Sequence, residues 1–166
     1  MASLRDRLIG AWRLAEFTVT AEDGTVTYPM GEDVEGLIIY TPDGYMSAQL
    51  MEPGRPAYAS GEFTHGTEEE EAAAAAGYLA YSGPFYVDEK TATLKHHMSV
   101  SLFPNWLNQT QERFVELEGD TLTITAAPIL VEGSARTPRL IWKRATPNRG
   151  HSPQRSRPAA QTSEGN

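Results

Sequence analysis

Short segments of strand-forming residues, each ended by a turn signal, make up most of this chain. Nine such segments are expected as strands, at 12–20, 25–28, 36–40, 45–51, 85–88, 93–102, 110–117, 121–127 and 138–143. Turn signals such as Asp23-Gly24 and the TPDG run at 41–44 separate consecutive segments. Because strands that follow one another in sequence usually pair, the pattern predicts an all-β, antiparallel fold of eight to nine strands, either a barrel or a sandwich.

Two segments depart from the strand pattern. A short helical turn is expected at 4–9, ahead of the first strand. Residues 67–80 hold four glutamates followed by five alanines, and alanine is the best helix former. Thr67 is placed to act as the N-cap, with Glu70 as its capping-box partner. This single Ala-rich helix, inserted between strands, is expected either to plug or cover the barrel or to form a lid over a pocket.

The composition indicates one folded domain followed by a tail. The chain has 166 residues, which is enough for one domain with a hydrophobic core. Residues 1–144 are expected to form this domain. Residues 145–166 are rich in Pro, Ser, Arg and Gln and hold no large apolar residue, so they are expected to be a disordered tail.

Charge and composition argue against several classes of function. The formal net charge is −8 and all but one of the acidic residues precede Ala145, which disfavours nucleic acid as a partner. There is no cysteine, no apolar run of membrane-spanning length and no apolar core of a secretory signal near residue 1. These features favour a cytoplasmic protein, present as a monomer or a weak homodimer, with no membrane partner.

Motifs for cofactors and metals are also missing from the sequence. It has no glycine-rich phosphate loop, and His96 and His97 are adjacent on a strand, so their side chains diverge instead of sharing a metal. We therefore expect no cofactor and no metal. Any catalysis by this chain would be cofactor-free.

Several motifs, in order along the chain, resemble one known family. They are Gly10-Ala11-Trp12, GLIIYTPDGYMSAQL at 36–50, Arg55-Pro56, AYSG at 80–83, HHMSVSLFPNW at 96–106, QTQERF at 109–114 and LIWKR at 140–144. Together they look like the bacterial and fungal lipocalin-like domain family, over nearly all of residues 8–144. Asn108 departs from this pattern, because members often carry glycine there.

The resemblance implies a lipocalin-like β-barrel, and it implies roles for particular residues. It places Trp12 at the closed end of the barrel, with Arg144 stacked across it. Some barrels of this general shape bind or isomerise polyketide-like or terpenoid-like intermediates of secondary metabolism.

The alternation of strand 93–102 selects the residues that face the barrel interior. Leu94, His96, Met98, Val100 and Leu102 share its apolar face. An inward histidine is either a satisfied core residue or a general acid/base. On the next strand, Gln111 and Arg113 share a face with Val115 and Leu117 and are expected inside as well.

Other candidate residues depend on the register of their strands. Glu16 points inward, as a partner of Arg113 or as a base, if Trp12 and Leu14 do; with Phe17 and Val19 inward instead, it is solvated. Met46 is expected inside with Ala48 and Leu50, and Trp106 is expected at the barrel mouth. Three further tyrosines are candidates to contact a ligand carbonyl: Tyr40, Tyr81 and Tyr86.

These residues support two main functions. In the first, the chain binds a small apolar molecule and catalyses its isomerisation, cyclisation or dehydration, with His96, Arg113 and Glu16 as the catalytic groups. In the second, it is a non-catalytic carrier, sequestering protein or resistance protein with the same pocket. A structural module whose barrel is filled by its own side chains is a third possibility.

Overall fold

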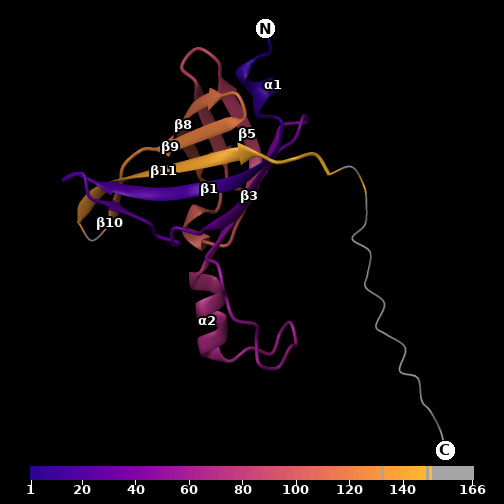
Figure 1. The fold of residues 1–166 in the computed structure, drawn as a ribbon, viewed down its shortest axis with the longest axis vertical. Coiled ribbons are helices and arrows are strands. Elements are labelled where there is room, and N and C mark those ends of the chain that lie inside the picture. Colours follow the sequence, from indigo (N-terminus) through magenta and orange to yellow (C-terminus); the bar gives the residue numbers. More distant parts are fainter. Residues whose placement is uncertain (132, 149, 151–166) are drawn as a thin grey trace, which may run out of the picture.

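The computed structural model describes residues 1–131, 133–148 and 150, and its central feature is a closed antiparallel barrel (Figure 1). Eight strands close it in the order β1-β3-β4-β5-β6-β8-β9-β11, and β11 pairs with β1 to complete the ring. The described helices and strands are α1 (Leu4–Leu8), β1 (Gly10–Ala21), β2 (Val26–Thr27), β3 (Glu35–Tyr40), β4 (Tyr45–Met51), α2 (Glu68–Ala76), β5 (Tyr78–Asp88), β6 (Thr93–His97), β7 (Val100–Ser101), η1 (Pro104–Trp106), β8 (Thr110–Glu118), β9 (Thr121–Ala126), β10 (Ile129–Val131) and β11 (Ser134–Arg144). The predicted lipocalin-like fold is confirmed.

A β-bulge in β1 changes which residues face inward. The pairing of β1 with β11 shifts between Leu14 and Glu16, so that Ala15 is the extra residue. Trp12 and Leu14 face the core before the bulge, whereas Phe17 faces the interior after it. Each of the two registers considered from the sequence therefore holds for one half of the strand. Glu16 pairs with Ile141 and does not line the interior pocket, so of the two alternatives considered for Glu16, the inward pairing with Arg113 is not formed.

The expected strand at 93–102 is interrupted. β6 ends at His97, and β7 begins at Val100 and pairs with β5. Leu94, His96 and Met98 are buried as predicted, but Val100 and Leu102 are exposed, which corrects their assignment to the interior. The alternation fails because the break at 98–99 resets the direction in which the side chains point. β5 is longer than expected, since it begins at Tyr78 and not at Phe85.

One end of the barrel is closed by two tryptophans and α1. Trp12 and Trp142 are fully buried, and the Trp12 Nε1–H donates to the Leu8 carbonyl at 2.9 Å. The Arg144 guanidinium carbon lies 4.0 Å from the centre of the Trp12 ring, and its nitrogens donate to the carbonyls of Arg7 and Ile9. This stacked pair is the closure that the family resemblance implied, and it leaves the opposite end for a pocket.

The predicted Ala-rich helix forms over Glu68–Ala76, ending before the expected residue 80 because β5 begins at Tyr78, and it does not cover the barrel. The Thr67 hydroxyl accepts from the Glu70 N–H, and the Glu70 carboxylate accepts from the Thr67 N–H, which completes the capping box. α2 projects away from the barrel (Figure 1), and none of its residues is buried or lines the interior pocket. The expectations of a plug or lid are therefore wrong, because an alanine face offers little apolar area to dock against the barrel.

The remaining expectations concern membranes and the tail. Among the described residues, no helix has the length and apolar character needed to cross a membrane. β11 ends at Arg144, and most of the expected tail at 145–166 lies outside the described residues.

Candidate functional site

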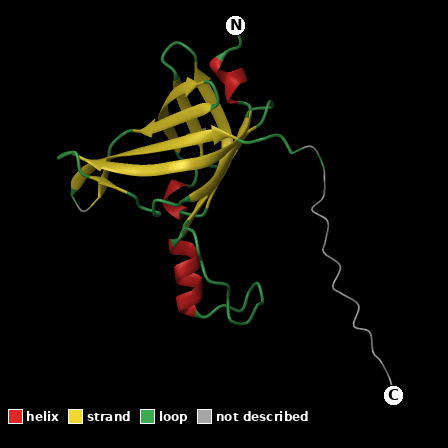
Figure 2. Ribbon diagram, viewed as in Figure 1, coloured by secondary structure: helices red, strands yellow, loops and turns green. Residues whose placement is uncertain are grey.

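A pocket of about 350 Å³ lies inside the barrel, toward the end opposite Trp12. Its wall is mostly aliphatic and aromatic and comes from strands on all sides of the barrel. The η1 turn, visible in Figure 2 as the short helix at the edge of the barrel away from α1, carries Trp106 to the pocket. The lining residues are Phe17, Leu50, Leu79, Tyr81, Trp106, Gln111, Glu112, Arg113, Ala126, Ala127, Pro128, Ile129, Pro138 and Leu140.

Polar groups gather on one side of this pocket. Arg113 and Gln111 follow one another on the inner face of β8, and the Arg113 Nη2–H donates to Gln111 Oε1. Tyr81 of β5 is the third polar side chain of the group. Burial raises the pKa of the Tyr81 phenol, and the charge of Arg113 opposes part of that rise. Tyr81 is therefore a neutral hydroxyl beside a guanidinium cation.

Aromatic rings form the part of the wall next to these polar groups. The Trp106 ring meets the Tyr81 ring edge-on, with centroids 5.8 Å apart and an interplanar angle of 76°. The Phe103 ring also meets the Trp106 ring edge-on, with centroids 5.6 Å apart. Such packing fixes the orientation of Trp106, so the indole is a preformed surface for a flat ligand.

His96 is next to this pocket but is not part of its wall. It is 1% exposed, and its Nε2 lies 3.0 Å from the hydroxyl of Tyr40. Burial first, and the charge of Arg113 second, lower the pKa of His96 to about 3. The Nδ1 atom has no partner among the described residues. The imidazole is thus neutral and shielded from the pocket, which is unfavourable for proton transfer to a ligand.

The depressed pKa of His96 predicts a pH-dependent stability. In the unfolded chain the pKa is near 6.5, so below that pH the unfolded state takes up a proton that the folded state refuses. The stabilisation is therefore complete above about pH 6.5 and is lost as the pH falls toward 3. Between pH 6.5 and pH 5 we expect this protonation to lower the free energy of unfolding of the wild type by roughly 1–2 kcal/mol. His96→Gln should abolish this part of the decrease.

Urea titrations at several pH values would measure this effect. His97→Gln is the matched control, because His97 lies on the outer face of the same strand and hydrogen-bonds Thr110. Identical pH slopes for the wild type and His96→Gln would contradict the prediction.

The structure separates the other sequence candidates into three groups. Tyr81, Trp106, Gln111 and Arg113 line the pocket together. Tyr40, Met46, His96 and Met98 are buried in the surrounding core without lining it. Glu16 and Tyr86 point away from the interior, and Tyr86 is 57% exposed, which corrects its assignment as a ligand contact. Tyr86 follows the buried Phe85 on β5, so strand alternation turns it outward.

Several lining residues were missed from the sequence. Phe17 belongs to the register that the bulge creates, and the segment 126–129 joins β9 to β10, a strand that the sequence did not suggest. Leu140 and Pro138 lie two and four residues before Trp142, so the alternation of the last strand was the signal that could have found them.

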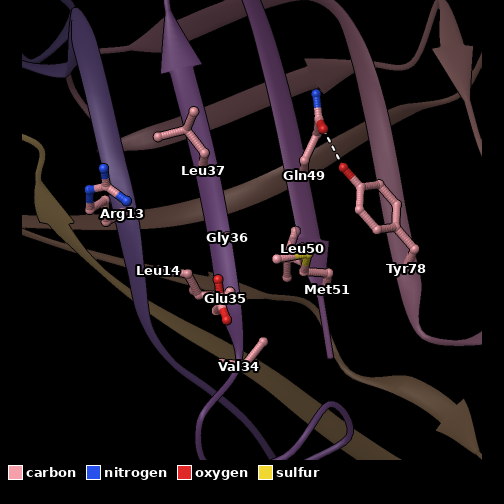
Figure 3. Close-up of a pocket in the computed structure, with 10 residues that line it drawn as sticks. All are labelled: Arg13, Leu14, Val34, Glu35, Gly36, Leu37, Gln49, Leu50, Met51 and Tyr78. Atoms are coloured by element: carbon pink, nitrogen blue, oxygen red, sulfur yellow. Dashed lines mark hydrogen bonds between the residues drawn. The ribbon is translucent and has the colours of Figure 1, made fainter. Parts of the chain in front are cut away.

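A second hollow, of about 290 Å³, lies over Gly36 on the outer side of the barrel (Figure 3). The exposed side chains of Arg13 and Leu37 flank it, and the Tyr78 hydroxyl donates to Gln49 Oε1 at its edge. A Cβ atom at Gly36 would lie 2.9 Å from both the Gln49 carbonyl oxygen and the Leu14 Cβ, so the strands approach closely at this glycine. This hollow contains none of the polar residues that meet in the interior pocket, which remains the better candidate site.

Among the described residues, no group of three or more histidine, cysteine or acidic side chains is arranged to hold a metal ion.

This chain matches one family model and is similar to known proteins. A family model described as a lipocalin-like domain matches residues 9–145. The chain belongs to this lipocalin-like domain family. It is 41% identical, over 106 residues, to the 4'-hydroxy-3'-methoxypropiophenone carrier protein ppsC of Aspergillus oryzae (strain ATCC 42149 / RIB 40), a match that covers 60% of this chain and 96% of that protein. A crystal structure of a lipocalin-like protein from Bacteroides uniformis ATCC 8492 is 16% identical with a TM-score of 0.44, and covers 83% of this chain and 98% of that one.

The backbone explains the departure at Asn108. Asn108 has φ = 62°, the left-handed region that glycine adopts without steric cost and that asparagine tolerates better than most residues. Its N–H donates to the Met98 carbonyl at 2.7 Å. Asparagine therefore preserves the turn that leads from η1 into β8.

Proposed function

We propose that this lipocalin-like protein binds one small aromatic or polyketide-like molecule in its barrel and carries it without changing it chemically. The observation that carries the proposal is the interior pocket, whose wall is mostly apolar, with its polar side chains, Tyr81 and the run Gln111 to Arg113, gathered in one place. Such a wall buries a hydrophobic body and orients it through a few polar contacts. At about 350 Å³, the cavity is near the lower end of the range for small-molecule sites and suits a single substituted ring.

The relative named above supports carriage over catalysis. Its name describes a carrier of an aryl ketone, and a pocket with flat aromatic walls and hydrogen-bond donors suits a molecule of that class. The catalytic alternative is a cofactor-free isomerisation, cyclisation or dehydration in which His96 moves a proton. The burial of His96, its bond to Tyr40 and its low pKa all weigh against that role.

The test uses 4'-hydroxy-3'-methoxypropiophenone as the probe. We expect the purified protein to bind one equivalent, measured by calorimetry, and to release it unchanged by mass spectrometry after long incubation. A probe that is converted to a product would contradict carriage, and failure of the wild type to bind it or related aryl ketones would contradict the proposed ligand class.

Trp106→Ala is expected to weaken binding of this probe by about tenfold or more, equivalent to roughly 1.4 kcal/mol. The variant removes the indole that packs on Tyr81 and forms one wall of the pocket. Phe114→Ala is the matched control, because Phe114 is an exposed aromatic residue on the outer face of β8. Equal affinities for the wild type and Trp106→Ala would argue against the interior pocket as the binding site.

A further inference from the structure

We propose that the carried molecule is held as an oxygen anion, a phenolate or enolate paired with Arg113, and that the pocket promotes its ionisation. This inference rests on the proposed carrier function and specifies its ligand. On binding, the O–H bond of a neutral phenol or enol breaks, the proton passes to solvent, and the remaining oxygen anion accepts hydrogen bonds from the guanidinium.

The hydrogen bonds of Arg113 leave its charge without a counter-ion. Its Nη1–H donates to the Glu112 carbonyl at 3.0 Å, and its Nη2–H donates to Gln111 Oε1. Both acceptors are neutral oxygens. The ion pairs formed within the described residues involve other cations, namely Lys95, His65 and Arg144. Glu112 also lines the pocket, but its carboxylate lies 3.9 Å from the Lys95 Nζ, and it forms no ion pair with Arg113.

An uncompensated guanidinium in such a wall favours an anionic ligand. Arg113 lies among apolar groups, including Leu140 and Trp106, where water is partly excluded. A guanidinium cannot release its proton to escape this environment, and it presents five N–H donors in a planar fork. An oxygen anion at this position compensates the charge and uses donors that the protein leaves free.

The chemistry of the wall favours a delocalised anion over a carboxylate or phosphate. The indole of Trp106 and the ring of Phe17 require a flat apolar body next to the charged end. A phenolate or enolate spreads its charge into such a body, so its burial costs less than that of a compact carboxylate.

The net charge of the chain suggests that ionisation follows entry. The formal charge of −8 repels anions from the protein surface. A neutral phenol or enol approaches without this repulsion, partitions into the apolar pocket and then loses its proton beside Arg113.

The experiment follows the absorption of bound 4'-hydroxy-3'-methoxypropiophenone, whose phenolate absorbs at longer wavelength than the phenol. We expect the pKa of the bound phenol to fall by about one to three units relative to free probe, the range for an adjacent opposite charge. Calorimetry in buffers of different ionisation enthalpy should show release of one proton at pH values between the two pKa values.

Substitutions in the pocket wall test whether the charge of Arg113 causes the pKa shift of the bound phenol. Arg113→Met should abolish the pKa shift, and Arg113→Lys should retain most of it. Arg139→Met is the matched control, because it makes the same charge change at an exposed position on β11. Should Arg113→Met fail to fold, Gln111→Glu offers a second test, since a carboxylate beside Arg113 should cancel the shift.

The 4'-methyl ether of the probe separates failure of this inference from failure of the carrier function. We expect the wild type to bind the ether at least about tenfold more weakly than the phenol, and Arg113→Met to bind the two equally. Equal binding of both by the wild type, or a bound phenol with an unchanged pKa, would overturn the anion inference while carriage stands. Binding of neither probe would overturn both proposals.

Discussion

Gly83→Ala is expected to destabilise the barrel by about 3 kcal/mol or more, because there is no room for a side chain at this position. A Cβ atom at Gly83 would lie 2.0 Å from the His97 carbonyl oxygen and 2.9 Å from the Ser99 N–H nitrogen. Both are backbone atoms at the break between β6 and β7, so neither can rotate away. The strands would have to separate, at the cost of the Ser99 N–H bond to the Ser82 carbonyl.

Urea unfolding of Gly83→Ala and Gly119→Ala would measure this effect. Gly119 has φ = 55°, and nothing lies within 4 Å of an added Cβ, so its alanine variant reports the backbone cost without a clash. The expected order is a much larger loss at Gly83, with an expanded or aggregating protein as its extreme. A Gly83→Ala variant as stable as Gly119→Ala would show that β5 and β6 can move apart freely.

Trp12→Ala is expected to lower the free energy of unfolding by about 3–5 kcal/mol. The indole is fully buried at the closed end, where it donates to the Leu8 carbonyl and lies beneath the Arg144 guanidinium. Truncation leaves a cavity and removes the aromatic face from the cation. Differential scanning calorimetry together with urea unfolding would quantify the loss.

Trp12→Phe separates the two contributions, since it keeps a ring beneath Arg144 and loses the N–H donor. It should be less destabilising than Trp12→Ala. Because Trp12 is outside the pocket wall, folded Trp12→Ala should still bind the ketone probe. A loss of stability below about 1 kcal/mol in Trp12→Ala would contradict the role of this residue in closing the barrel.

Much of the fold could be predicted because its signals are local. Turn residues at 23–24 and 41–44 fall between strands, and the capping box at Thr67 and Glu70 forms as expected. Alternation placed Gln111 and Arg113 on the inner face of β8. These features depend on residues close in sequence, whose φ/ψ preferences and periodicity persist in the folded chain.

The errors arise where a single residue shifts the alternation. The extra residue Ala15 turns Glu16 outward and Phe17 inward, and the break after His97 exposes Val100. A period of two carries any such shift to every later residue of the strand. Bulges and breaks are set by pairing with strands far away in sequence, so the segment itself gives little sign of them.

The two ends of the barrel show which features the sequence determined and which depended on the tertiary structure. Local periodicity in the sequence by itself determined an antiparallel all-β fold with Gln111 and Arg113 on an inner face, because alternation is enough to specify a face. The barrel form and the position of Trp12 at its closed end were implied by the family resemblance. Only the tertiary structure decided that Tyr81, Trp106 and Arg113 share one pocket while His96 is withdrawn against Tyr40. These groups come from different strands and from η1, and their distances depend on closure of the whole ring.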